Sequence, residues 1–336
     1  MHESPETTAR RIAERFFKRE PQKLRAVVGK GFVNEVWIAE ADSERIVIRM
    51  NDADSRAEAI YVKEKWCMEQ AAEAGIPGAK VLELGTCGGT PYMIQTFEPG
   101  ENGLEVPDAR LEIWHRIGEY AALFHAVPAR GRGEELIDPV RGRFRSPPHP
   151  GFDGSWSGYL AYNIASLNDE DELIARGFIT PDESRQARRI FEEMRGKNYR
   201  FGLIHGDLSL KNTLVRSAEH GGPDKESGGE RLHVTLLDWG SAEVAPVPHG
   251  DLIQLIQTQA RDGTPSEEEF LAFLDGYGLG EDIQAETREL LLLAMFDKLR
   301  WAIDCNPGEI EGFARLVREA LRLNGVGGGL NGINKE

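Results

Sequence analysis

The residues whose types and spacing could do chemistry lie in two short segments of the second half of the chain. The first is the sequence HGDLSLKN from His205 to Asn212, and the second, 26 positions after Asn212, is DWG from Asp238 to Gly240. Phosphoryl transfer needs a carboxylate to orient and deprotonate the acceptor hydroxyl, and hard oxygen ligands for magnesium on the phosphates. Asp207 followed by Asn212 supplies both from one loop, and Asp238 completes the metal site. The spacing therefore predicts phosphoryl transfer.

These motifs resemble those of the aminoglycoside phosphotransferase family, a kinase-like group that includes antibiotic, choline, homoserine and fructosamine kinases. The resemblance covers roughly residues 22–320, and the order of the predicted elements agrees with it. It implies that Asp207 is the catalytic residue and that Asn212 and Asp238 bind Mg²⁺, with Trp239 where protein kinases usually have phenylalanine. It also implies ATP as the phosphate donor, with GTP as the alternative. Without that chemistry, Asp207 would merely cap a turn and Asp238 would end a strand.

A glycine-containing segment near the start of the chain resembles the family's nucleotide loop. Gly29, Gly31 and Asn34 lie between two predicted strands, and glycines let the backbone approach phosphate closely. The segment matches neither the Walker pattern nor GxGxxG, because its third position is Asn34. Taken alone, it is equally typical of a β-hairpin.

Two charged residues are expected to assist nucleotide binding. Arg49, in the predicted strand 43–50, stands where protein kinases place a lysine, and its guanidinium can bridge phosphate oxygens. Its ion-pair partner should lie on the following helix, where Glu64 is the better match by position and Glu58 the alternative. A solvated helix face is the competing interpretation for both glutamates.

The resemblance implies a bilobal, protein-kinase-like α+β fold. A small β-rich nucleotide-binding lobe is expected over residues 1–97, a hinge over 98–103, a helical catalytic and acceptor-binding lobe over 104–324 and a flexible tail over 325–336. Gln95 and Phe97 align with the segment whose backbone would hydrogen-bond the adenine. The side chains there indicate little by themselves.

Hydrophobic patterning and turn residues predict the elements of both lobes. Strands are expected within 23–38, 43–50, 80–85 and 90–97, with an intervening helix at 57–74. In the second lobe we expect helices at 108–127, 158–195, 284–304 and 308–323, and short strand-and-loop segments at 203–215 and 232–238. Asp108 is the expected cap of the first of these helices. A long loop at 142–156 and a floppy insertion at 220–230 complete the prediction.

Several residues near the motifs have predicted supporting roles. His205 is expected to order the catalytic loop by hydrogen bonding rather than to act as a base. Lys211 is expected to be a solvated lysine, and His115 and His125 to be packed or solvated. These interpretations follow from their positions on a polar loop and on the helix predicted at 108–127.

Composition limits the classes of partner and of compartment. The 336 residues carry 40 basic and 56 acidic side chains, a net charge of −16, which argues against a general nucleic-acid binder. The longest apolar run, Leu290 to Phe296, is too short to span a membrane, and Met1 to Lys18 has no apolar core of secretory type. Three distant cysteines form no disulfide framework. These observations favour a cytoplasmic protein without a nucleic-acid or membrane partner; the oligomeric state stays open.

The acceptor itself is not identified by any motif. Residues 241–336 carry 8 basic and 17 acidic side chains, a net charge of −9, and this excess together with the resemblance favours an aminoglycoside or a similar cationic acceptor. Asp251, Asp297, Asp304 and Glu309 are equally plausible as acceptor ligands at this stage. The alternatives are a metabolic or macrolide kinase with a sugar, choline-like or homoserine-like acceptor, a non-catalytic nucleotide-binding module and a helical partner-binding protein.

Overall fold

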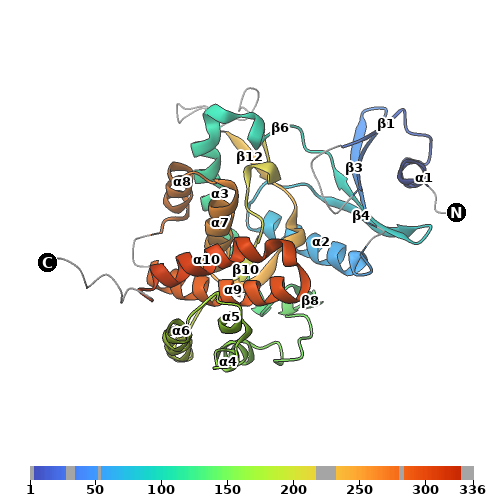
Figure 1. Ribbon diagram of the computed structural model, residues 1–336. Helices are drawn as coiled ribbons and strands as arrows, with labels where there is room; N and C mark the ends of the chain where they lie inside the picture. Colours follow the sequence, from blue (N-terminus) through green and yellow to red (C-terminus); the bar gives the residue numbers. More distant parts are fainter. Residues whose placement is uncertain (1–3, 28–34, 52–53, 217–231, 280–283, 327–336) are drawn as a thin grey trace.

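The chain folds into a small β-rich lobe and a larger helical lobe, as a computed structural model shows (Figure 1). The structure describes residues 4–27, 35–51, 54–216, 232–279 and 284–326. The expected α+β fold, with a β-rich and a helical lobe, is therefore confirmed. The insertion expected at 220–230 lies outside the described residues, as does the tail from residue 327 onward.

The small lobe is built on one antiparallel sheet with the strand order β1-β2-β3-β5-β4. Its strands match the predicted alternation of Val- and Ile-rich runs with turns. Their bounds are β1 (Lys23–Ala26), β2 (Glu35–Ala41), β3 (Glu44–Met50), β4 (Val81–Cys87) and β5 (Thr90–Thr96). In the register between β3 and β5, Arg49 lies opposite Met93.

Helices cover both faces of this sheet, and the alternation of side chains along β3 assigns each residue to a face. Ile46 and Ile48 pack in the cluster that includes Ile12 of α1 (Pro5–Phe17). Arg49 points to the opposite face, where α2 (Ala57–Glu73) lies between the sheet and the larger lobe (Figure 1). Helix α1 was not predicted from the sequence, although Ser4 caps it by accepting a hydrogen bond from the N–H of Thr7.

The connection between the lobes is hydrogen-bonded to the larger lobe. Strand β6 (Glu101–Asn102) pairs with β11 (Thr213–Arg216), which in turn pairs with β12 (His233–Leu236). The Nδ2 atom of Asn102 also donates to the carbonyl oxygen of Lys211 at 2.8 Å. The segment expected to be a hinge thus contacts the loop at 205–212, which is called the catalytic loop after its expected role. The motion of this segment as a hinge stays a prediction.

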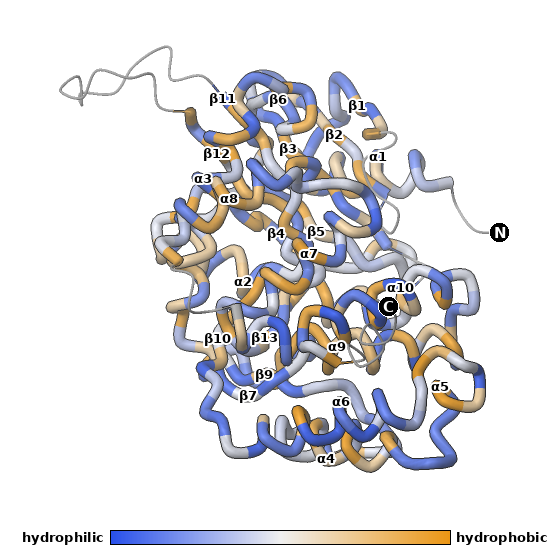
Figure 2. Tube along the Cα trace, turned by 60° about the vertical axis from the view of Figure 1, so that its left-hand side comes forward, coloured by the Kyte–Doolittle hydropathy of each residue, from blue (hydrophilic) through white to orange (hydrophobic). Residues whose placement is uncertain are grey.

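The larger lobe consists mainly of helices around two hydrophobic clusters. The helices are α3 (Arg110–Phe124), α4 (Trp156–Ser166), α5 (Glu172–Ala175), α6 (Pro181–Met194), α7 (His249–Asp262), α8 (Glu267–Tyr277), α9 (Gln284–Cys305) and α10 (Ile310–Leu323). In Figure 2 the hydrophobic positions of α9 lie in the middle of this lobe, and the largely hydrophilic α6 lies at its edge. Within the described part of the chain, no helix is long and apolar enough to cross a membrane.

Two helix predictions in this lobe were wrong in detail. The helix expected at 108–127 begins only at Arg110, because a 3₁₀ turn at 107–109 precedes it, and Asp108 is not its cap. The helix expected at 158–195 is divided into α4, α5 and α6. Asp171 and Thr180 each cap the start of a new helix there, and capping side chains compete with helix continuation.

A small three-stranded sheet links the lobes beside α2. Its strands are β7 (Arg130–Gly131), β8 (Glu135–Asp138) and β9 (Arg143–Arg145), so β9 falls within the loop expected at 142–156. Trp66 of α2 donates from Nε1 to the carbonyl oxygen of Pro139 at 2.9 Å, and its ring packs edge-on against Phe144. These contacts hold α2 against the larger lobe.

The burial of α1 predicts that this helix stabilises the small lobe. Ile12 is only 1% exposed, so Ile12→Ala should lower the free energy of unfolding by about 2–4 kcal/mol through lost burial and a residual cavity. Urea unfolding of the full chain measures this change. Glu14→Ala, on a more exposed position of the same helix, is the control; equal effects of both substitutions would show that α1 contributes no core packing.

Candidate active site

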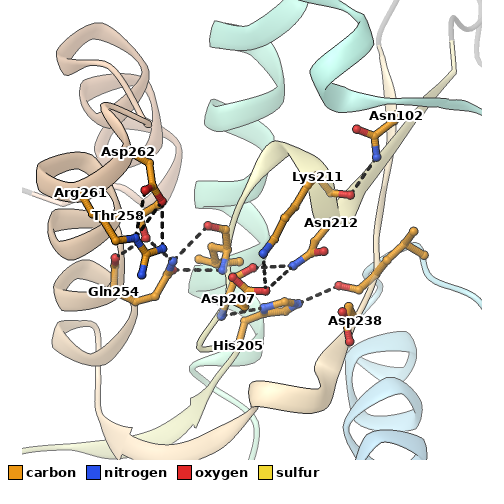
Figure 3. Close-up of polar contacts among 12 residues, drawn as sticks. Asn102, His205, Asp207, Lys211, Asn212, Asp238, Gln254, Thr258, Arg261 and Asp262 are labelled. Carbon is orange, nitrogen blue, oxygen red and sulfur yellow. Dashed lines mark hydrogen bonds and ion pairs between the residues drawn. The ribbon is translucent and has the colours of Figure 1, made fainter. Parts of the chain in front are cut away.

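The catalytic loop follows the end of β10 (Phe201–Ile204) and carries Asp207 beside two polar partners. The Nδ2 atom of Asn212 donates to the main-chain oxygen and to Oδ2 of Asp207, both at 2.9 Å. The ammonium of Lys211 lies 3.1 Å from the same Oδ2 (Figure 3). Asp207 is one-third exposed, so its carboxylate remains accessible. The sequence suggested that Lys211 is a solvated lysine, but its ammonium is paired with Asp207.

His205 connects the two motif segments. Its Nδ1 accepts the N–H of Asp207 at 3.3 Å, so the proton of the neutral ring lies on Nε2, which donates to the carbonyl oxygen of Leu237 at 3.0 Å. Leu237 directly precedes Asp238. The side chain is fully buried, which confirms the expected ordering role and excludes direct contact with a substrate.

Gly206 and Asp238 occupy backbone conformations that side chains rarely adopt. Gly206 has φ +76°, and a Cβ there would lie 2.4 Å from the carbonyl oxygen of Ser241. This position requires glycine, because the catalytic loop passes directly against the turn that follows Asp238. Asp238 itself has φ +63°, a left-handed conformation that aspartate tolerates better than most residues.

Asp251 of α7 anchors the catalytic loop, and its side chain is fully buried. Its Oδ1 accepts the N–H of Gly206 at 2.8 Å, and its Oδ2 accepts the N–H of His205 at 3.1 Å. The Nε2 atom of His125 lies 2.9 Å from Oδ2. Burial alone would raise the pKa of Asp251, but His125 and the N–H of Gly206 outweigh it and lower this pKa.

Asp251 is therefore excluded as an acceptor ligand, because both oxygens of its carboxylate bind the loop. His125 is packed, as expected, and it also positions Asp251. One signal was available: an acidic residue lies on the otherwise apolar face of an amphipathic helix, beside Leu252 and Leu255, which are also buried. One turn further on, Gln254 accepts the N–H of Leu208 at 3.0 Å (Figure 3).

Arg49 lies between Glu64 and Asp238. Its Nη1 donates to Glu64 Oε2 at 2.5 Å, and its Nη2 donates to Asp238 Oδ1 at 3.2 Å. Burial by itself would lower the pKa of Arg49, but the two carboxylates raise it, so the guanidinium stays charged. The expected ion pair with Glu64, rather than with Glu58, is confirmed. The contact with Asp238 was not predicted.

The residue next to Glu64 holds the turn that follows Asp238. Lys63 is 4% exposed, and its ammonium donates to the carbonyl oxygens of Gly240 at 2.8 Å and Ala242 at 2.9 Å. Helix α2 therefore contacts both Arg49 and the turn after Asp238 through adjacent side chains. No sequence pattern singled out Lys63, because a lysine on a helix is usually solvated.

The predicted nucleotide-binding residues are only partly described. Gly29, Gly31 and Asn34 lie outside the described residues. Gln95 is buried, and its Nε2 faces the sulfur atoms of Met68 and Met93, each at 3.5 Å.

Phe97, two residues further along the chain, carries the guanidinium of Arg45 over its ring at 4.4 Å. The roles expected for Gln95 and Phe97 in adenine binding stay predictions.

Two oxygen donors are available for a metal ion. Because Nδ2 of Asn212 donates to Asp207, its side-chain oxygen remains as an acceptor and points away from Asp207 in Figure 3. The side chain of Asp238 is 48% exposed and presents its carboxylate. Among the residues that the structure describes, no three His, Cys, Asp or Glu side chains are grouped to bind a metal. The donor set of one amide and one carboxylate oxygen suits Mg²⁺ that is also bound by phosphates.

A cavity of about 330 Å³ opens beside the catalytic loop. Gly206, Ser241 and Gln254 line the side that meets the loop. Two carboxylates, from Glu243 of β13 (Glu243–Pro246) and Asp297 of α9, also line it, and burial raises the pKa of both. Two partly desolvated carboxylates thus lie in a cavity whose wall includes Gly206, the residue before Asp207.

Comparisons with known proteins agree with this geometry. A family model described as the phosphotransferase enzyme family matches residues 25–290. A search of the curated proteins found no match. Among solved structures, the GDP and kanamycin complex of APH(2")-IIia is 15% identical with a TM-score of 0.59, over 93% of this chain and 97% of that chain.

Two small-molecule kinases have similar structures. An ethanolamine kinase of Plasmodium vivax is 15% identical with a TM-score of 0.57, covering 93% of this chain and 86% of that chain. A microcompartment-associated aminopropanol kinase is 16% identical with a TM-score of 0.53, covering 90% of each chain. These likenesses show the kinase-like fold, and the family match covers most of the chain. The chain therefore belongs to the phosphotransferase enzyme family and is a kinase-like phosphotransferase.

Proposed function

We propose that the chain transfers the γ-phosphate of ATP to a hydroxyl of a small, amine-bearing molecule, with Asp207 as the catalytic base. One observation carries this proposal: His205 hydrogen-bonds both to the N–H of Asp207 and to the carbonyl oxygen of Leu237, beside Asp238. The base and the phosphate-side carboxylate are therefore held by one buried ring, and a cavity opens next to them.

The nucleotide would lie between the lobes. Arg49, held by Glu64 and by Asp238, is positioned to contact phosphate oxygens with its planar guanidinium. Asn212 and Asp238 would bind Mg²⁺, which when bound neutralises charge on the phosphates. Gly29, Gly31 and Asn34 are proposed as the loop over the phosphates, and the backbone around Gln95 and Phe97 as the adenine site.

Asp207 acts on the acceptor hydroxyl. Its Oδ2 is engaged by Asn212 and Lys211, so Oδ1 is the oxygen proposed to accept the proton. The hydroxyl oxygen then forms a bond to the γ-phosphorus, the bond from that phosphorus to the β-γ bridging oxygen breaks, and ADP leaves. The ammonium of Lys211 lies where it can stabilise negative charge on the transferred group.

The cavity beside Asp207 is the proposed acceptor site. Carboxylates of Glu243 and Asp297 suit an amine on the acceptor, as an aminoglycoside or a similar cationic molecule would have. A compact metabolic acceptor is the second candidate, and the cavity size favours it, since about 330 Å³ lies at the small end of the ~300–1,000 Å³ typical of ligand pockets.

Three further features of the proposal concern the donor, turnover and compartment. GTP is the alternative donor, because one of the similar structures is a GDP complex. A binding module without turnover is disfavoured, because Asp207, Asn212 and Asp238 are all present. Cys67, Cys87 and Cys305 are free thiols, which supports a reducing, cytoplasmic location.

Replacing the base should abolish most turnover without preventing nucleotide binding. Asp207→Asn should lower kcat by about 10²–10⁴-fold, because the amide cannot accept the proton. ADP release with a turned-over acceptor measures kcat, and calorimetry measures ATP affinity. Asp169→Asn, an exposed site in a distant turn, is the control. Near-normal turnover in Asp207→Asn would assign the base to another residue.

The ion pair between Arg49 and Glu64 should act as one unit in nucleotide binding. Arg49→Ala should raise the KM for ATP by about 10–100-fold, corresponding to ~1.5–3 kcal/mol for a charge-assisted contact. Arg49→Lys should restore binding only in part, because an ammonium cannot make two parallel contacts. Glu64→Ala should give a milder defect than Arg49→Ala.

A double-mutant cycle tests the coupling. If the two residues act together, the variant lacking both Arg49 and Glu64 should be no worse than Arg49→Ala. The exposed pair Arg15–Glu83, at 2.8 Å in the same lobe, is the control and should leave the KM unchanged. Strictly additive losses at Arg49 and Glu64 would contradict the coupling.

A further inference from the structure

The cavity beside the catalytic loop contains two charges of each sign. Arg132 and Lys298 line it together with Glu243 and Asp297. They come from the segment between β7 and β8, from β13 and from α9, so three distant parts of the chain contribute. In the described chain, none of these four groups forms an ion pair with another charged side chain. Arg132 is close enough to Glu243 and Asp297 to lower the pKa of each carboxyl, but it forms no direct ion pair with either of them.

The environment of these groups shows that their charges are incompletely compensated. Burial raises the pKa of Glu243 and of Asp297, and Arg132 offsets only part of this rise at each. Desolvated charges are costly unless a partner of opposite sign reaches them. A ligand that brings only positive charge would satisfy the carboxylates and leave Arg132 and Lys298 without a counter-ion.

Arg132 is held rigidly. Its guanidinium lies 4.0 Å from the centre of the Tyr159 ring and 5.7 Å from that of Trp156, and Nη1 donates to Ser146 Oγ at 2.7 Å. The flanking Gly131 and Gly133 have φ +90° and +100°, and a Cβ at either would collide with backbone. The chain is thus bent to place Arg132, whose remaining N–H groups can grip a carboxylate with two parallel hydrogen bonds.

One side chain sets the distance between positive and negative groups. The face of the Tyr159 ring supports Arg132, and the Tyr159 hydroxyl lies near Asp297, where it lowers the pKa of that carboxyl against the effect of burial. The cation and the carboxylate therefore have a fixed spacing, as recognition of a molecule with two charged groups requires. Because Tyr159 is almost fully buried, a ligand cannot change this spacing without repacking the lobe.

We propose that the acceptor is amphoteric: Arg132 and Lys298 bind its carboxylate, and Glu243 and Asp297 bind its ammonium group. Arg132 is then the residue that separates hydroxylated amino acids from amino alcohols and from sugars. This inference rests on the proposed function, because it assumes that the cavity receives the acceptor. It narrows the acceptor class from cationic to zwitterionic.

The test uses matched sets of molecules that differ only in their charged groups. One set is ethanolamine, L-serine and 3-hydroxypropionate, and the other is 3-aminopropanol, L-homoserine and 4-hydroxybutyrate; kanamycin is included as a polycation. ADP release measures kcat/KM on the full chain, and calorimetry with Mg²⁺ and a non-hydrolysable ATP analogue measures binding. In at least one set, the kcat/KM of the amino acid should exceed that of each of the other two molecules by at least about tenfold.

Variants then locate the preference. Arg132→Met should raise the KM for the preferred amino acid by at least about tenfold, with a smaller effect on kcat, and should bring the ratio of amino acid to amino alcohol towards one. Lys298→Met should do the same more weakly, since it lies nearer solvent. Arg143→Met removes a guanidinium from the exposed side of the neighbouring β9 and should keep the preference. Thermal unfolding of each variant shows whether it is folded.

Two results would overturn the inference. One is that no carboxylate-bearing molecule in the sets binds or is phosphorylated. The other is that an amino alcohol or kanamycin is preferred and Arg132→Met leaves that preference unchanged. Either result with turnover that still depends on Asp207 rejects the zwitterionic acceptor and retains the phosphotransferase proposal. Turnover that is independent of Asp207 rejects the proposed function instead.

Discussion

The geometry of the active site depends on one buried carboxylate. Asp251 has no access to water, so its charge is tolerable only because the N–H groups of His205 and Gly206 and the ring of His125 all point at it. These contacts join α3, α7 and the loop after β10 at a single point. Asp207 directly follows the two residues that Asp251 binds. Its position is therefore fixed by these backbone hydrogen bonds as well as by its own contacts.

The small lobe is attached to this centre through α2. Lys63 and Glu64 are adjacent, yet they serve different segments: Lys63 binds the carbonyl oxygens of the turn after Asp238, and Glu64 binds Arg49 on β3. Trp66 adds a contact with the small sheet of the larger lobe. The helix thereby holds Arg49 and the turn after Asp238 in one arrangement, and a shift of α2 would disturb both together.

The overall acidity of the chain has less bearing on the acceptor than its sequence suggested. The net charge of −9 over residues 241–336 does not translate into a uniformly negative cavity, because Asp251 is a structural anchor and Arg132 and Lys298 line the cavity together with its two carboxylates. Local desolvation and spacing, rather than total charge, decide which ligand a partly buried site prefers.

Local spacing was enough to predict several parts of the site and fold. The motif at 205–212 with Asp238 indicated the chemistry, and the position of Glu64 in its helix identified the partner of Arg49, because short loops and single helices fix such distances within the chain. Likewise, the periodic face of α3 is buried as predicted.

Only the tertiary structure decided what depends on contacts between distant segments. Asp251 became an anchor and Lys63 a support because folding placed backbone groups opposite them. The cavity joins Arg132, Glu243 and Asp297, which are too far apart in the chain for any spacing rule to relate them. A side chain's charge is determined by sequence, but its burial and its partners are set by the packing of the whole lobe, and these decide its function.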